Sequence, residues 1–189
     1  MTTGTKSNQR GHILDVALRL LSTHGSAAMS MRHLARECGL GVAALYHYFD
    51  SKDALLAAVV EERRYGARLA EPPVIDPTGS VEHRLRQIFA EMWRGALEEE
   101  AIWRLLLGEG LRSEPTVLPV GQVLLETVET GLGAWIGAVV PELDDPRAAA
   151  ELLIGQMFAG FIRHIFDPSL DVGRIERHAA DALVAVLSG

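Results

Sequence analysis

The chain has 189 residues, of which 48% are hydrophobic and 23% charged, and its formal net charge is −7. This composition is typical of a globular protein with one large or two small domains, and it excludes fibrous and disordered chains. Ala and Leu, both strong helix formers, contribute 24 and 26 residues, so the sequence predicts an all-α fold.

The sequence contains no candidate membrane span. Its longest uncharged stretches have 12 residues, whereas a spanning helix needs about twenty apolar residues in a row. The polar first eleven residues are also unlike a secretory signal. A single cysteine, Cys38, excludes an internal disulfide and a multi-thiolate metal site, and we interpret it as a core residue. We expect a cytoplasmic protein that uses no metal or cofactor and does not bind membranes.

Positive charge gathers near the start of the chain. Residues 1–68 hold nine Lys or Arg and six Asp or Glu, a balance of +3, and the remaining residues have a balance of −10. This asymmetry would let the first segment approach phosphate while the rest is repelled. A difference of this size also arises by chance, so it supports a nucleic-acid partner only together with specific motifs.

Four helices are predicted in the first 70 residues. Apolar residues recur at helical spacing over 13–21, and this first helix ends at Gly25, a typical C-terminal cap. Ser30 is placed to cap a short second helix that ends before Gly39.

The third and fourth helices follow closely. The third runs from near Gly41 to Phe49. Asp50 or Ser51 then caps a longer helix over 52–69, and a proline-rich linker follows it.

The two short helices have the pattern of a helix-turn-helix. Helices that cross so closely need a tiny residue at the contact, a residue tolerating positive φ four places later, and an apolar anchor about six places further on. Ala35, Gly39 and Leu45 have this spacing. Small and apolar residues are common, so the pattern gains weight only from its surroundings.

Three segments surround this pattern: Met29–Ala35, Leu45–Phe49 and Ser51–Leu56. At these residues the sequence resembles the DNA-binding head of the TetR family of transcriptional regulators, over roughly residues 10–57. The resemblance implies a homodimer that binds double-stranded operator DNA. Each subunit would place its third helix in the major groove of one half-site.

The resemblance also implies roles for single residues. Tyr46 and Lys52 would contact phosphate, and Ser30 and Arg32 would lie near the DNA backbone or base edges. Lys52 begins a helix, where its charge opposes the helix dipole, and a phosphate opposite would offset this cost. A solvated lysine, and a core role for Tyr46 and Tyr48, are the alternatives.

The start of the expected recognition helix departs from the family pattern. Gly41 and the three residues after it offer no side-chain hydrogen bonds to base edges. Specificity for the operator sequence must therefore come from methyl contacts to thymine, from Arg32 and His47, and from DNA shape. The expected DNA-binding set is Ser30, Arg32, Val42, Ala43, Ala44, Tyr46, His47, Tyr48 and Lys52, with Phe49 in the core.

Five further helices are predicted beyond the linker, over 80–99, 101–111, 116–140, 146–166 and 172–187. The expected fold therefore has about nine helices. Its domains are a helix-turn-helix DNA-binding domain over 1–70, with its core at 10–57, and a helical regulatory and dimerisation domain over 71–189.

The second domain combines two kinds of residue. Glycines let helices approach closely, as a dimer seam requires, and the TetR family dimerises through its penultimate helices. The glycines expected at such a seam are Gly131, Gly133, Gly137, Gly155 and Gly160. Bulky, adaptable side chains are typical of a pocket for a largely apolar ligand, and an ordinary core is the alternative. The side chains of this kind in the second domain are Phe89, Met92, Trp93, Trp103, Met157, Phe158 and Phe161.

The sequence shows no zinc-protease, nucleophile-elbow, phosphate-loop or paired-thiol motif, so we expect no enzyme and no catalytic residues. The predicted function is that of a dimeric TetR-like regulator, most simply a repressor released by a small-molecule effector. The residues do not distinguish repressor from activator. The alternative is an all-α ligand-binding or catalytic protein whose helix-turn-helix is only structural.

Overall fold

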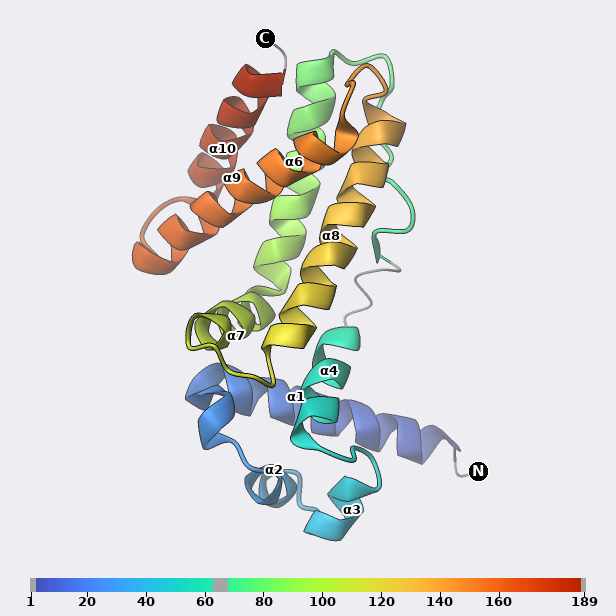
Figure 1. Ribbon diagram of the computed structural model, residues 1–189, viewed down its shortest axis with the longest axis vertical. Coiled ribbons are helices and arrows are strands. Elements are labelled where there is room, and N and C mark those ends of the chain that lie inside the picture. The colour runs from blue at the N-terminus through green and yellow to red at the C-terminus, as the bar shows by residue number, and fades with distance from the viewer. Residues whose placement is uncertain (1–2, 63–67, 188–189) are drawn as a thin grey trace. The chain divides into compact units, whose positions relative to one another are not determined.

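The computed structural model describes residues 3–62 and 68–187, and over these ranges the chain forms nine helices and no strand (Figure 1). The helices belong to two compact units. The first unit contains α1 (Thr3–Ala28), α2 (Met31–Glu37), α3 (Val42–Tyr46), α4 (Lys52–Glu61) and α7 (Glu100–Leu111). The second contains α6 (Val81–Glu98), α9 (Pro146–Phe166) and α10 (Val172–Leu187), and α8 (Leu118–Val139) begins in the first unit and continues in the second. The all-α prediction is confirmed.

The predicted helix boundaries agree closely with the observed ones. The last two helices match residue for residue, and the three before them differ by at most two residues at either end. The third helix was predicted to reach Phe49, but α3 ends at Tyr46, because the chain turns at His47. The fourth was predicted to reach about Leu69; α4 is described to Glu61, and residues 63–67 lie outside the described residues.

The helix α1 is bent at Gly25. This residue has φ 77° and ψ 167°, a conformation that interrupts the helix before one last turn ending at Ala28. The sequence predicted the end of the first helix at this glycine, and the backbone does leave the helical conformation there, with one further short turn after it. As a whole, α1 packs against α7, α4 and α2 within the first unit.

The geometry of α2 and α3 confirms the helix-turn-helix. Ala35 and Leu45 are fully buried where the two helices pack together. Gly39 has φ 68°, the left-handed conformation that the turn requires and that glycine adopts without strain. The hydroxyl of Ser30 caps α2 by accepting the backbone N–H of His33 at 3.1 Å.

The fourth helix is held by a similar cap. The Oγ of Ser51 accepts the N–H of Ala54 at 3.0 Å, so Ser51 rather than Asp50 is the cap residue. The apolar side chains of α4, including Leu55 and Leu56, are almost fully buried, and α4 packs against α1. Burying each large aliphatic side chain contributes about 1.5–3 kcal/mol, which is how the short helices are held in place.

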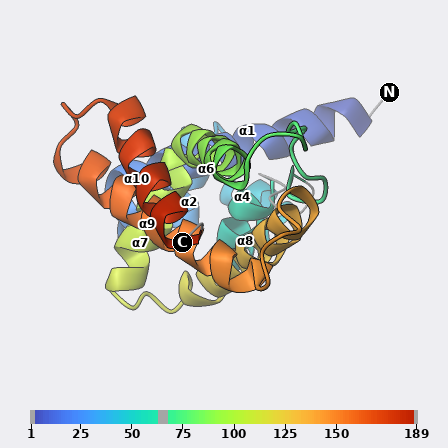
Figure 2. The same ribbon diagram turned by 90° about the horizontal axis from the view of Figure 1, so that it is seen from above.

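In the second unit, α10 packs along both α9 and α6 (Figure 2). Gly160 of α9 makes room for the ring of Trp93, since an ideal Cβ at this glycine would lie 3.2 Å from Trp93 Cζ3. The buried guanidinium of Arg84 ties loops of this unit together. It donates to the carbonyls of Val139 and Gly79, at 2.6 and 3.0 Å, and pairs with Glu142.

The packing units do not coincide with the expected division at residue 70. Residues 99–124, expected in the second domain, belong to the same unit as the helix-turn-helix, because α7 lies against α1. No helix in the described part of the chain is long and apolar enough to cross a membrane.

Candidate nucleic-acid interface

The exposed surface of the helix-turn-helix consists of the start of α2 and the outer side of α3. Arg32 is exposed, and no carboxylate lies within ion-pair distance of it in the described ranges. Val42 and Ala43 are exposed at the start of α3, and Ala44 is half-buried. The N-cap of α3 is Gly41, which supplies no side-chain hydrogen bond, as expected from the sequence.

The aromatic segment after Leu45 has both exposed and buried side chains. Tyr46 is 46% exposed and His47 is exposed, whereas Tyr48 is half-buried. Phe49 is 4% exposed, so its predicted place in the core is confirmed, and the guanidinium of Arg10 lies 5.5 Å from its ring centroid. The ring of Tyr46 is therefore available to a partner, and that of Phe49 is not.

Lys52 has a protein partner that the sequence did not reveal. Its Nζ donates a hydrogen bond to the backbone carbonyl of Ser26, just beyond the bend in α1, and the residue is half-buried. This carbonyl supplies negative partial charge opposite a lysine at a helix start, the role that the sequence analysis gave to phosphate. An ammonium group has three donors, so phosphate contact stays possible and stays a prediction.

The sequence profile of a family described as bacterial regulatory proteins, tetR family, matches residues 13–59. The HTH-type transcriptional regulator BetI of Rhizobium meliloti is 32% identical over 151 residues, which are 77% of this chain and 73% of BetI. The chain belongs to the TetR family.

Two further similarities are consistent with this assignment. The transcriptional repressor KstR of Rhodococcus jostii is 31% identical over 126 residues, which are 66% of this chain and 59% of KstR. The structure of Salmonella enterica GusR shares the fold, with a TM-score of 0.73, 21% identity and 96% coverage of both chains. The chain spans little more than half the length of several curated relatives, between 52% and 59%.

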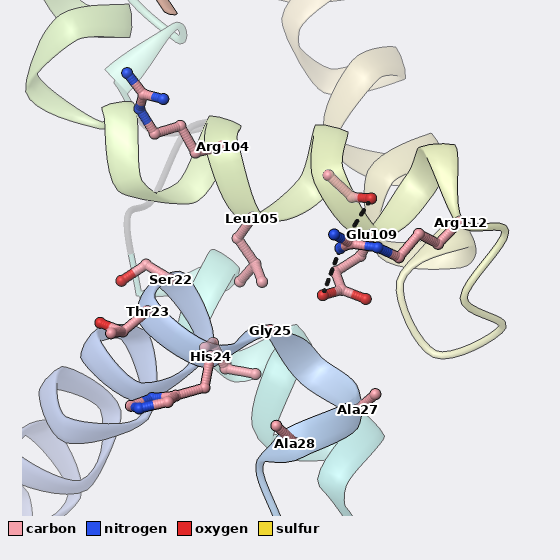
Figure 3. A pocket seen from close by; sticks show the side chains of 12 residues that line it. Ser22, Thr23, His24, Gly25, Ala27, Ala28, Arg104, Leu105, Glu109 and Arg112 are labelled. Atoms are coloured by element: carbon pink, nitrogen blue, oxygen red, sulfur yellow. Dashed lines mark hydrogen bonds and ion pairs between the residues drawn. The ribbon is translucent and has the colours of Figure 1, made fainter.

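Glu109, which the sequence analysis did not single out, contacts the DNA-binding head of this TetR-family protein at α1. It points from α7 toward the bend of α1 (Figure 3) and is 3% exposed. Its carboxylate accepts the N–H and the hydroxyl of Ser26, at 2.9 and 3.0 Å. Arg112 Nη1 lies 3.5 Å from Oε1 of the same carboxylate. The only sequence signal was a charged residue between Gly108 and Gly110, just after the three leucines of α7.

An open cleft of about 510 Å³ lies beside this contact, between α1 and α7. His24 and Arg104 lie on its walls together with Gly25, Glu109 and Arg112 (Figure 3). A second open cleft, of about 800 Å³, is lined by Leu69 and residues of α8. Neither cleft is lined by the residues predicted to bind a ligand.

Those predicted ligand-binding residues lie on three helices. Phe89, Met92 and Trp93 are on α6, and Met157, Phe158 and Phe161 are on α9, in the same unit; Trp103 is on α7, in the other unit. Most of them are buried, as in an ordinary core. Trp93 differs, because its indole N–H is buried without a hydrogen-bond partner among the described residues.

The glycines predicted at a dimer seam also separate into two groups. An ideal Cβ on Gly131, Gly133, Gly137 or Gly160 would contact other residues of this chain. Gly155 is exposed, and nothing lies within 4 Å of its ideal Cβ. It belongs to an exposed apolar row on α9 that we name the α9 stripe: Ala148, Leu152, Gly155, Ala159, Ile162 and Phe166.

No cluster of His, Cys, Asp or Glu suited to a metal occurs in the residues that the structure describes. Burial raises the pKa of the Cys38 thiol above its usual value, which disfavours the reactive thiolate.

Proposed function

We propose that this protein is a transcriptional regulator that binds double-stranded operator DNA as a homodimer. More specifically, we propose a cytoplasmic repressor that a small-molecule effector releases from its operator. The observation that carries the proposal is the exposed outer side of α3, held by a helix-turn-helix whose contact, turn and anchor positions are all suitably filled. Its relative KstR is named a repressor, which supports that direction of regulation.

The proposed DNA contacts divide by chemistry. Tyr46 and Lys52 contact phosphates, which position the head and provide much of the affinity. Ser30 and Arg32 at the start of α2, Val42, Ala43 and Ala44 of α3, and His47 and Tyr48 in the turn after α3 lie toward backbone and base edges. Because the start of α3 is apolar, methyl contacts and DNA shape contribute much of the specificity.

The α9 stripe supports dimerisation with a second copy. Its members alternate in spacing by four and three residues, the pattern with which helices of paired subunits interdigitate. Small residues at Gly155 and Ala159 allow close approach, and Leu152 and Ile162 supply apolar area that is exposed in the single chain. Two heads joined in this way can read the two half-sites of an operator.

The proposed effector is largely apolar and carries a hydrogen-bond acceptor. It binds among the predicted ligand residues of α6 and α9, where Trp93 and Phe89 stack with ring centroids 6.4 Å apart. A buried N–H without a partner costs about 1–3 kcal/mol, and an acceptor on the effector would remove this cost at Trp93.

A DNA-retardation experiment tests the proposal. The purified protein should retard DNA from the region upstream of its own gene. The logarithm of its association constant should fall linearly with the logarithm of the salt concentration, with a slope of roughly −0.9 for each phosphate neutralised. A binding signal that is absent, or that does not respond to salt, would favour the alternative of a ligand-binding or catalytic protein with a structural helix-turn-helix.

A further inference from the structure

Ser26 is held by all of its polar groups. Its N–H and its hydroxyl both donate to the carboxylate of Glu109, and its carbonyl accepts from Lys52 Nζ. The residue has no exposed area. Three helices therefore meet at one serine: α7 through Glu109, α4 through Lys52, and α1, to which the serine belongs.

The bend at Gly25 makes this meeting possible. An ideal Cβ at Gly25 would lie 2.7 Å from Glu109 Oε1, so the carboxylate occupies the space that a side chain would need. The positive φ of Gly25 also turns the N–H of Ser26 out of the helix and toward α7. A buried carboxylate is costly unless donors surround it, and Ser26 provides two of them.

The same serine connects Glu109 to a residue of the DNA-binding head. Lys52 begins α4, and in the proposed function it contacts phosphate. The Ser26 carbonyl restricts Lys52 Nζ to one place and leaves two of its three protons for another acceptor. A lysine held in this way loses less conformational freedom when it meets a phosphate.

We propose that Glu109 is a positioning residue for DNA binding, acting through Ser26 on Lys52. With its carboxylate in place, Ser26 keeps its carbonyl toward α4 and Lys52 is aligned for phosphate. When α7 withdraws Glu109, the N–H and the hydroxyl of Ser26 lose their acceptor and only its carbonyl stays bonded, to Met29 N–H at 3.2 Å. Lys52 then loses its alignment and operator affinity falls. This inference rests on the proposed DNA-binding function. It adds to that function a residue, Glu109, that lies 83 positions after its partner Ser26 in the sequence.

The test measures operator affinity at several salt concentrations. Glu109→Ala should weaken binding roughly tenfold and lower the salt slope by about one per subunit, the change that Lys52→Ala should also cause if Lys52 contacts phosphate. Glu109→Gln, which can accept the N–H and donate to the hydroxyl of Ser26, should stay within about twofold of the parent. The matched control is Glu100→Ala, a half-buried glutamate of α7 paired with Arg104 on the same helix, which should change neither quantity.

A double variant separates positioning from general destabilisation. If Glu109 acts through Lys52, Glu109→Ala should add little to the loss caused by Lys52→Ala, whereas independent effects would multiply. An unchanged salt slope in folded Glu109→Ala, or fully multiplicative losses, would overturn the inference. Should Glu109→Ala fail to fold, Glu109→Asp, whose shorter side chain draws the carboxylate away from the N–H and hydroxyl of Ser26, carries the test with Glu100→Asp as its control, and an unchanged slope there has the same meaning. A parent protein that retards no DNA would instead contradict the proposed function.

Discussion

Gly131 of α8 lies directly against Leu69. An ideal Cβ on this glycine would stand 2.6 Å from Leu69 Cβ, closer than real Cβ contacts occur. The indole N–H of Trp135, one turn further along α8, donates to the carbonyl of Leu69 at 2.9 Å. The segment at Leu69 is therefore held on α8 both by close packing and by a buried hydrogen bond.

This relationship predicts opposite effects for two neighbouring glycines. Gly131→Ala should destabilise the protein by about 1–3 kcal/mol, because the added methyl overlaps Leu69. Gly133→Ala is the matched variant: its Cβ would meet Arg147 Cα at an ordinary 3.8 Å, so it should stabilise the helix by roughly 0.5–1 kcal/mol. Urea unfolding of both variants measures the difference, and equal stabilities would contradict it.

The exposed Tyr46 should be needed for operator binding and not for folding. Tyr46→Ala should weaken binding to all DNA sequences alike, with an unchanged melting temperature, because the ring is 46% exposed. Tyr46→Phe separates the hydroxyl from the ring and should show most of this loss if phosphate accepts the O–H. Gel retardation beside thermal denaturation decides the matter. Normal binding by a folded Tyr46→Ala would place the interface elsewhere.

The helix-turn-helix could be predicted from sequence because its requirements are local. Ala35, Gly39 and Leu45 lie within eleven positions, and the Ser30 and Ser51 caps act on N–H groups three residues away. Packing between distant segments could not be predicted in this way. The carboxylate that holds Ser26 comes from a helix 83 positions later, and it is polar, so no apolar periodicity marks it.

The glycines of the second unit illustrate a second limit. Their helical spacing was visible in the sequence, but spacing alone does not say which face of a helix meets its own chain. The structure separates Gly155, whose Cβ direction is open, from Gly160, which packs against Trp93.

Dimerisation should therefore depend on the α9 stripe. Gly155→Arg and Leu152→Glu should each shift the protein toward monomer, because an unpaired charge buried in a helix seam costs about 3–5 kcal/mol. Val123→Glu is the control, since Val123 is an exposed apolar residue on α8, outside the stripe. Sedimentation at micromolar concentration reports the result. Intact dimers in both stripe variants would move the seam to another surface.

The Arg84–Glu142 pair should make stability depend on pH. The hydrogen bond from Arg84 lowers the pKa of Glu142 below its usual 4.5 in the folded protein. A lowered pKa stabilises the folded state above pH 4.5, and this contribution is lost as the pH falls through the folded value. Glu142→Gln should therefore be less stable than the parent at pH 7, with the difference narrowing below pH 4.5. Glu151→Gln is the control for the loss of a surface carboxylate: Glu151 is in an exposed pair at 3.8 Å with Arg147, so this variant should change stability at pH 7 by less.

The effector prediction begins with finding a ligand. A thermal-shift screen of apolar compounds that carry a hydrogen-bond acceptor should identify binders, since a ligand at a hundred times its Kd adds about 2.7 kcal/mol of stability. Trp93→Phe keeps an aromatic ring and removes the unpartnered N–H together with part of the ring volume, so it should weaken such a ligand by roughly five- to tenfold. Trp135→Phe is the control, because its N–H already serves Leu69 within the chain.

The effector and the operator should then weaken each other's binding by the same factor. An effector that releases the repressor can do so only by preferring a conformation that binds DNA less well, and the coupling free energy is shared by both ligands. Titrating the effector with and without saturating operator, followed by tryptophan fluorescence, measures this factor. Trp93 on α6 reports the proposed site, and Trp103 on α7 reports the helix that holds Glu109. Equal effector affinity in both titrations would mean that this ligand does not regulate DNA binding. A reciprocal loss that disappears in Glu109→Ala would assign the coupling to the contact between Glu109 and Ser26.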